Sequence, residues 1–182
     1  YPLRRQRQMC IETDIIDHID SFKNKSGFRS EFEPSNEDIN KICSILECAG
    51  LIHDIGNPPF GHSGERAIAT YFSEGNGQII KQELKNEYHW QDLTHFEGNA
   101  NAFRLLTHQF KGRRPGGFAL TYSTLASIVK YPYSSIQSTK KGKSGFFTSE
   151  KQDFLRIARD LGLLPDGDSC LLYTSPSPRD KR

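Results

Sequence analysis

Apolar residues in this chain recur every three or four positions, the spacing of an α-helix, and no segment sustains the alternation typical of a β-strand. On this basis the sequence predicts helices over about residues 35–54, 63–72, 97–110, 122–131 and 149–161. The large side chains of Trp90, Phe103 and Phe154 are predicted to lie in the core. The fold class that follows from this pattern is all-α.

The helix predicted over residues 35–54 carries the clearest local signals. Asp38 follows Ser35 by three positions, the capping-box pattern of a helix N-terminus. The apolar positions of this helix fall on one stripe, made of Ile39, Ile42, Leu46 and Ala49. His53 extends the stripe, and Asp54 follows directly. Because such a stripe is normally buried, we expect His53 to point inward with Asp54 beside it.

The charge and cysteine content narrow the class of protein. The 24 lysine and arginine residues nearly balance the 22 aspartate and glutamate residues, so no overall charge favours binding to nucleic acid or a membrane surface. No apolar run approaches the ~18 residues of a membrane span. The four cysteines form no Cys-x-x-Cys pair, and the basic N-terminal residues precede no apolar signal segment. A cytoplasmic protein is therefore expected.

Ionisable residues are concentrated in the run from His53 to Glu65. Imidazole nitrogen and carboxylate oxygen suit a divalent cation, which keeps positions open for water and phosphate oxygens and lowers the pKa of bound water. Glycines and prolines in the run would fold the chain back and bring His62 and Glu65 close to His53 and Asp54. The alternative is that the His-Asp pair is only a satisfied polar pair at a helix end.

Residues 49–65 resemble the signature of the bacterial deoxyguanosine triphosphate triphosphohydrolases, a branch of the HD-domain phosphohydrolases. The matching run is Ala-Gly-Leu-Ile-His-Asp-Ile-Gly-Asn-Pro-Pro-Phe-Gly-His-Ser-Gly-Glu. Three later segments, at residues 96–101, 120–132 and 145–150, resemble further motifs of that family in the same order. The resemblance extends over about residues 39–165 and implies the HD-domain helical fold.

The resemblance also implies an activity. The family converts a deoxynucleoside triphosphate, dGTP above all, to deoxynucleoside and inorganic triphosphate with Mg²⁺ or Mn²⁺, and its members form homo-oligomers. By position, His53 and Asp54 correspond to metal ligands, and His62 and Glu65 to the catalytic pair beside the scissile phosphate. The positions associated with holding the polyphosphate are Lys130, Tyr131 and Lys143.

Two departures from the family pattern set further expectations. The family's first metal-binding histidine stands in a Thr-His-Ser context that His18 lacks, and no match to its last metal-binding aspartate precedes residues 168–182. Residues 168–182 resemble translated adapter sequence and are expected to be non-native. We therefore expect residues 1–167 to be a partial HD domain, incomplete at both ends and inactive alone, in which the metal site lacks two protein ligands.

Other readings of the sequence remain open. The chain could be an HD phosphohydrolase that acts on another nucleotide, or a non-enzymatic binder of nucleotide or single-stranded DNA. A DNA contact has only the basic cluster of Lys111, Arg113 and Arg114 to support it. Ser63 is predicted to cap a helix rather than to act as a nucleophile. The remaining histidines are predicted to be surface or structural residues instead of metal ligands, namely His89, His95 and His108.

Overall fold

A computed structural model describes residues 35–84, 86–112, 115–136 and 143–163. The chain divides into two compact units, Tyr1–Leu51 and Ile52–Arg182. The expectations that concern His18, Arg113, Arg114 and residues 168–182 lie outside the described residues. The described residues form helices and contain no β-strand, only an isolated bridge between Ser134 and Phe146. The prediction of an all-α fold is thus confirmed for this part of the chain.

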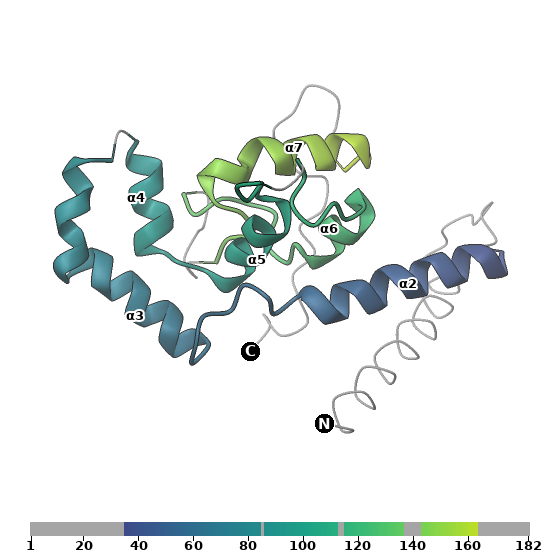
Figure 1. Ribbon diagram of the computed structural model, residues 1–182, viewed down its shortest axis with the longest axis horizontal. Coiled ribbons are helices and arrows are strands. Elements are labelled where there is room, and N and C mark those ends of the chain that lie inside the picture. The colour runs from purple at the N-terminus through teal and green to yellow at the C-terminus, as the bar shows by residue number, and fades with distance from the viewer. Residues whose placement is uncertain (1–34, 85, 113–114, 137–142, 164–182) are drawn as a thin grey trace, which may run out of the picture. The chain divides into compact units, whose positions relative to one another are not determined.

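The described part of the first unit is the body of helix α2, Asn36–Ile52 (Figure 1). Its capping box forms as predicted: Ser35 N donates to Asp38 Oδ2 at 3.1 Å, and Asp38 N donates to Ser35 Oγ at 3.2 Å. The prediction of a buried stripe is wrong for these residues, since no residue of α2 is buried and Ile42 is 40% exposed. Within the described part of this unit, no second element is present for the stripe to pack against.

The second unit contains the other elements, which run in the order drawn in Figure 1. They are α3 (His62–Ser73), the 3₁₀ helix η1 (Asn76–Gln82), α4 (Glu87–Thr94), α5 (Gly98–Thr107), α6 (Tyr122–Ile128), the 3₁₀ turn η2 (Thr148–Glu150) and α7 (Lys151–Asp160). Helix α3 packs against η1 and α4, while α5, α6 and α7 contact one another. Among the described helices, none has the length and apolar content needed to cross a membrane.

The core of this unit is formed by α5, α6, α7 and the segment before α7. It consists of Phe103, Leu106, Leu125, Phe146, Phe154 and Ile157. The rings of Phe146 and Phe154 stack at a centroid distance of 4.2 Å, and Phe103 meets Phe154 edge-on. Trp90 is also buried, so the three predicted core aromatic residues are confirmed. Burial of these large rings against one another holds α5 and α7 together.

Several helix boundaries differ from the prediction because local signals were misread. Neither η1 nor α4 was predicted from the sequence. Asn86 caps α4 by accepting a hydrogen bond from Tyr88 N at 2.9 Å. Helix α6 ends at Ile128 instead of residue 131. The signal for α4 was an ordinary N-cap asparagine followed by a short, mainly polar helix without a clear apolar stripe.

The predicted helix cap at Ser63 does not form. Gly61, not Ser63, is the N-cap of α3, and Ser63 Oγ instead accepts from Arg66 Nη2 at 3.1 Å. Gly61 has φ 54°, in the left-handed region that favours glycine. The N-cap residue of α7, Glu150, makes no side-chain capping hydrogen bond, and its carboxyl is buried next to Arg104. Gly162, with φ 66°, follows the end of α7.

Burial of Glu150 leads to a prediction about stability. Arg104 Nη1 donates to Oε1 at 3.3 Å, whereas Oε2 is buried with no partner among the described residues. Burial raises the pKa of Glu150, against the opposing effects of Ser149 and Arg104. Because the pKa of Glu150 is higher in the folded state, protonation stabilises the folded state fully at pH values below the ordinary glutamate pKa. This stabilisation is lost as the pH rises through the folded-state pKa. Glu150→Gln should therefore become more stable relative to wild type as the pH rises above the ordinary glutamate value of 4.5.

Urea denaturation of both chains at pH values below and above that value measures the difference. Asp160→Asn on the same helix is the control, because Asp160 is exposed. A constant difference between Glu150→Gln and wild type at all pH values would contradict the prediction.

Candidate functional site

The loop between α2 and α3 lies directly against the first turns of α5. A Cβ atom at Gly56 would lie 2.1 Å from Ala102 N and 2.2 Å from Gly98 O, so the two backbones approach as closely as glycine allows. Asn101 Nδ2 donates a hydrogen bond to Gly56 O at 2.9 Å. The predicted tight return of this loop is thus built by backbone contact with α5. This contact fixes the position of the loop backbone, from which the side chains of the loop extend.

His53 and Asp54 lie together at the start of this loop. His53 Nε2 is 3.1 Å from Asp54 Oδ2, and Asn57 Nδ2 donates to Asp54 Oδ1 at 2.9 Å. The two side chains are 59% and 55% exposed, so the expectation that His53 points inward is wrong. The reason is that α2 ends at Ile52, and a turn over residues 53–56 takes His53 out of the helical register.

These two side chains supply the nitrogen and oxygen donors that a divalent cation accepts. Within the described ranges, however, no group of three or more His, Cys, Asp or Glu side chains converges on one point. His53 and Asp54 could therefore supply two of the ligands of a metal site that other residues complete.

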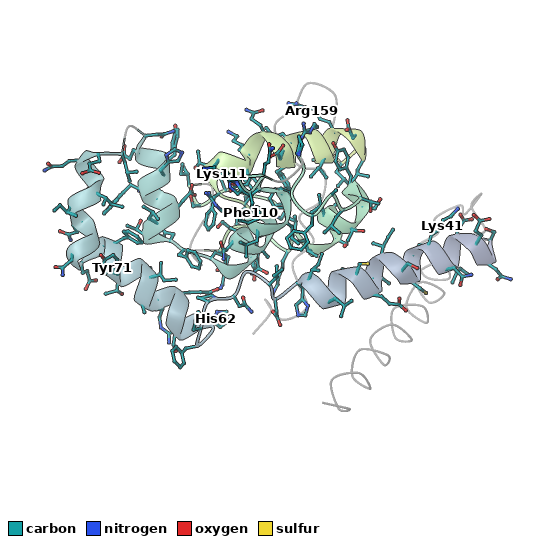
Figure 2. The ribbon with its side chains drawn as sticks, viewed as in Figure 1. Lys41, His62, Tyr71, Phe110, Lys111 and Arg159 are labelled. Carbon is teal, nitrogen blue, oxygen red and sulfur yellow. The ribbon has the colours of Figure 1, made fainter. Side chains whose placement is uncertain are left out.

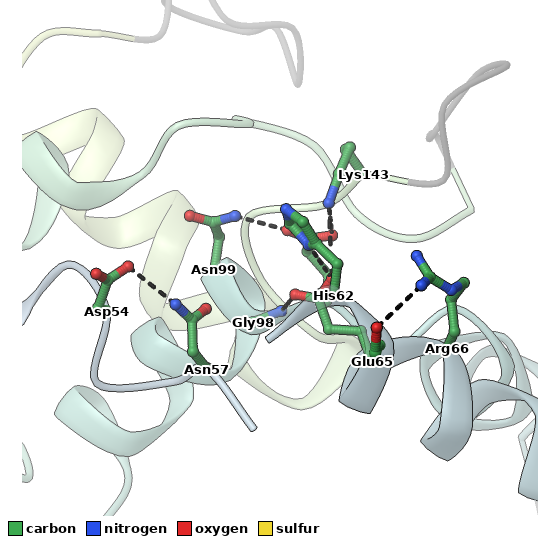
Figure 3. Close-up of polar contacts among 10 residues, drawn as sticks. Asp54, Asn57, His62, Glu65, Arg66, Gly98, Asn99 and Lys143 are labelled. Carbon is green, nitrogen blue, oxygen red and sulfur yellow. Dashed lines mark hydrogen bonds and ion pairs between the residues drawn. The ribbon is translucent and has the colours of Figure 1, made fainter. Parts of the chain in front are cut away.

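His62 lies on the first turn of α3 (Figure 2) and forms a second pair with Glu65 on the same turn. As predicted from their spacing, they share one helix face, and His62 Nδ1 lies 2.7 Å from Glu65 Oε2. The other oxygen of Glu65 accepts a hydrogen bond from Gly98 N at 2.9 Å, at the N-terminus of α5 (Figure 3). The side chain of His62 is 75% exposed and that of Glu65 is 10% exposed. A buried carboxylate thus orients an accessible imidazole.

The pKa of Glu65 is lowered even though burial by itself would raise it. The hydrogen bonds from His62 and Gly98, together with the charges of Lys143 and His62, outweigh the burial. An ionised Glu65 can only accept hydrogen bonds, so the Nδ1 atom of His62 carries the proton. The Nε2 atom is then the position at which a neutral His62 can take up a proton, as a general base does.

Lys143 and Glu97 join this pair from distant parts of the chain. Lys143 Nζ donates to Glu97 Oε2 at 2.7 Å and lies 3.8 Å from Glu65 Oε2. Burial would lower the pKa of Lys143, but the hydrogen bond to Glu97 and the charges of Glu97, Glu65 and Tyr131 raise it. We call these four residues, His62, Glu65, Glu97 and Lys143, the polar cluster. It places an ammonium group beside an oriented imidazole.

The other two residues expected to bind polyphosphate are placed differently. Tyr131 is close enough to Lys143 to contribute to its raised pKa. Lys130 is exposed, and its Nζ lies over the Tyr131 ring at 5.2 Å from the centroid. The structure therefore brings Lys143, His62 and Glu65 together, with Tyr131 near Lys143 and Lys130 in contact with the Tyr131 ring.

Sequence reasoning missed Glu97 and Asn99. Glu97 is 2% exposed, and its Oε1 accepts from Asn99 Nδ2 at 2.6 Å. Both residues stand in the segment 96–101 that carries the family resemblance, but nothing in their spacing indicated contact with Lys143. The only available signal was a glutamate at a helix start, next to a phenylalanine and a glycine. His89, His95 and His108 are exposed on the surface.

The fold and the site together define a helical protein in which the His53–Asp54 and His62–Glu65 pairs lie on one loop–helix unit and Glu97 and Lys143 join the second pair from distant segments. Comparison with known proteins agrees with this class, because the HD domain model matches residues 36–137. The chain belongs to the HD domain family.

Curated relatives extend the comparison. A deoxyguanosinetriphosphate triphosphohydrolase-like protein of Synechocystis sp. is 44% identical over 130 residues, which is 66% of this chain and 30% of that protein. One of the same name from Pseudomonas aeruginosa is 43% identical over 127 residues, 65% of this chain and 28% of that protein. A deoxyguanosinetriphosphate triphosphohydrolase of Yersinia enterocolitica is 33% identical over 151 residues, 66% and 29% of the two chains. The chain thus spans less than a third of the length of these relatives.

Proposed function

We propose that this chain is part of a longer hydrolase that converts a deoxynucleoside triphosphate, dGTP above all, to deoxynucleoside and inorganic triphosphate. The observation that carries the proposal is the convergence of His62, Glu65 and Lys143 from two distant segments. An oriented imidazole beside an ammonium group suits proton transfer next to a phosphate oxygen. The names of the matched relatives support the choice of substrate.

The residues of this chain would have distinct roles in that reaction. Water attacks the α-phosphorus, the bond from this phosphorus to the 5′ oxygen breaks, and the leaving oxygen takes up a proton. His62 would carry the proton through Nε2, while Glu65 holds its Nδ1 proton in place. Lys143, with Tyr131 close by, would neutralise charge on the phosphate oxygens. Lys130 would meet the distal end of the phosphate chain from its exposed position.

The longer protein would also need a divalent cation, Mg²⁺ or Mn²⁺, for which His53 and Asp54 would supply two ligands. We propose that it is cytoplasmic and forms homo-oligomers. For the 182-residue chain alone we expect no appreciable turnover, because its described residues do not complete a metal site.

An assay of the longer protein tests the proposal. Incubation with dGTP and Mn²⁺ should release deoxyguanosine and inorganic triphosphate, which chromatography of the products separates and identifies. Release of the monophosphate with pyrophosphate would contradict the proposed reaction. Chelation of the cation with EDTA should abolish turnover, and the 182-residue chain assayed in parallel should remain inactive.

A substrate panel separates the alternative functions. Turnover of a nucleoside monophosphate, a cyclic nucleotide or an alarmone in place of dGTP would favour another HD phosphohydrolase. Binding of dGTP or single-stranded DNA without any turnover would favour a non-enzymatic binder. Either result would replace the proposed activity.

A further inference from the structure

Glu97 stands at a helix N-terminus, but its side chain does not cap the helix. It is the N-cap residue of α5, yet its side chain makes no capping hydrogen bond to that helix. Residues preferred at this position are short and use their side chains for capping. The amide of Gly98, at the start of the same helix, is instead satisfied by the carboxylate of Glu65. The carboxylate of Glu97 is therefore left for other partners.

Those partners are two side chains of the site. Glu97 Oε1 accepts from Asn99 Nδ2 at 2.6 Å, and Oε2 accepts from Lys143 Nζ at 2.7 Å. Because Glu97 is 2% exposed, a carboxylate without a cationic partner would be strongly disfavoured there. The buried charge of Glu97 therefore holds Lys143 Nζ at the position where the two groups pair.

The backbone next to Lys143 is also fixed. Ser144 is fully buried, Gly145 N donates to Tyr133 O at 3.1 Å, and a Cβ at Gly145 would lie 2.0 Å from Tyr131 O. Lysine normally keeps several rotatable bonds free, but here both ends of the side chain are held. The ammonium group stays 3.8 Å from Glu65 Oε2, next to the His62–Glu65 pair.

We propose that Glu97 is a positioning residue that holds the Lys143 ammonium beside His62, ready to bind the phosphate chain of a nucleotide. This inference rests on the proposed function for the nature of the ligand, but not for the contact between Glu97 and Lys143. Glu97 acts through Lys143 and does not itself touch the ligand.

The first test concerns the pairing alone. In the 182-residue chain with ¹³C-labelled lysine, NMR titration should show a Lys143 pKa above the ordinary 10.5, and Glu97→Gln should lower it. A Lys143→Arg spectrum identifies the signal. Asp153→Asn, which removes a carboxylate paired with Arg156, is the matched control and should leave the Lys143 signal unchanged. A wild-type value at or below 10.5 would overturn the proposal even if Glu97→Gln failed to fold.

The second test concerns the ligand and uses the longer protein. Calorimetry with inorganic triphosphate should show about tenfold weaker binding for Glu97→Gln, the effect of a lost charge-assisted contact. The KM for dGTP should rise by a similar factor, with kcat changed much less. Unchanged triphosphate binding would overturn the positioning role, whatever the pKa result.

The two tests separate this inference from the proposed function. Turnover of dGTP with unchanged KM and unchanged Lys143 pKa in Glu97→Gln would overturn the inference and leave the proposed function standing. Absence of dGTP turnover, with a lowered Lys143 pKa and weaker triphosphate binding in the variant, would overturn the proposed function and support the positioning role.

Discussion

Replacing Glu65 with Gln should lower kcat for dGTP in the longer protein by about 10²–10⁴-fold while leaving the fold intact. In the variant, the amide oxygen can still accept from Gly98 N, as Oε1 of Glu65 does at 2.9 Å. The amide NH₂ would then face His62 Nδ1, which lies 2.7 Å from Oε2 in the wild type. The imidazole would have to accept at Nδ1 and carry its proton on Nε2. The atom proposed to take up a proton would already be protonated.

Steady-state kinetics at saturating dGTP measure this effect, and circular dichroism checks the helical content. Ser63→Ala is a suitable control, because Ser63 is exposed on the same helical turn and its side chain accepts a hydrogen bond from Arg66 and not from His62 or Glu65. Its kcat should stay within about twofold of wild type, as for most surface substitutions. If kcat of Glu65→Gln also stayed within that range, the proposed role of His62 would be wrong.

The second large effect is expected on stability. Gly56→Ala should destabilise the chain by at least about 2 kcal/mol, because overpacking against rigid backbone cannot be relieved by side-chain rotation. The added methyl group would lie 2.1 Å from Ala102 N and 2.2 Å from Gly98 O. Either the loop or the start of α5 must move, which also displaces the hydrogen bond from Asn101 to Gly56 O.

Urea denaturation of the 182-residue chain gives the free energy of unfolding for this comparison. Gly112→Ala is the control: it meets no atom within 4 Å, but its φ of 77° makes alanine unfavourable there. That variant should lose about 1 kcal/mol from backbone strain alone. A Gly56→Ala variant no less stable than Gly112→Ala would show that the contact between the loop and α5 is not tight.

Local sequence signals predicted the parts of the fold that depend on neighbouring residues. The capping box at Ser35 and Asp38, and the pairing of His62 with Glu65, involve residues three positions apart, whose relative geometry a helix fixes. The buried positions of Phe103 and Phe154 followed from helical periodicity. Each of these features depends on residues that lie within one or two turns of the same helix.

The features that were missed depend on contacts between distant segments. Lys143 and Glu97 are 46 positions apart, and no local pattern indicates that their side chains meet. The exposure of His53 was mispredicted because the stripe was extended past Ile52, where the helix ends. For the stripe itself, periodicity shows which residues share a face of α2 but not whether another element covers that face.

The carboxylate of Glu65 links helix α3 to helix α5, because it bonds both the His62 imidazole and a backbone amide. One oxygen meets the first amide of α5, and the other meets the imidazole on α3. Loosening of that helix junction would therefore rotate the imidazole before the molecule unfolds. In the longer protein, sequence changes at the junction, even those far too mild to affect yield or solubility, should be visible first as a loss of the proposed turnover.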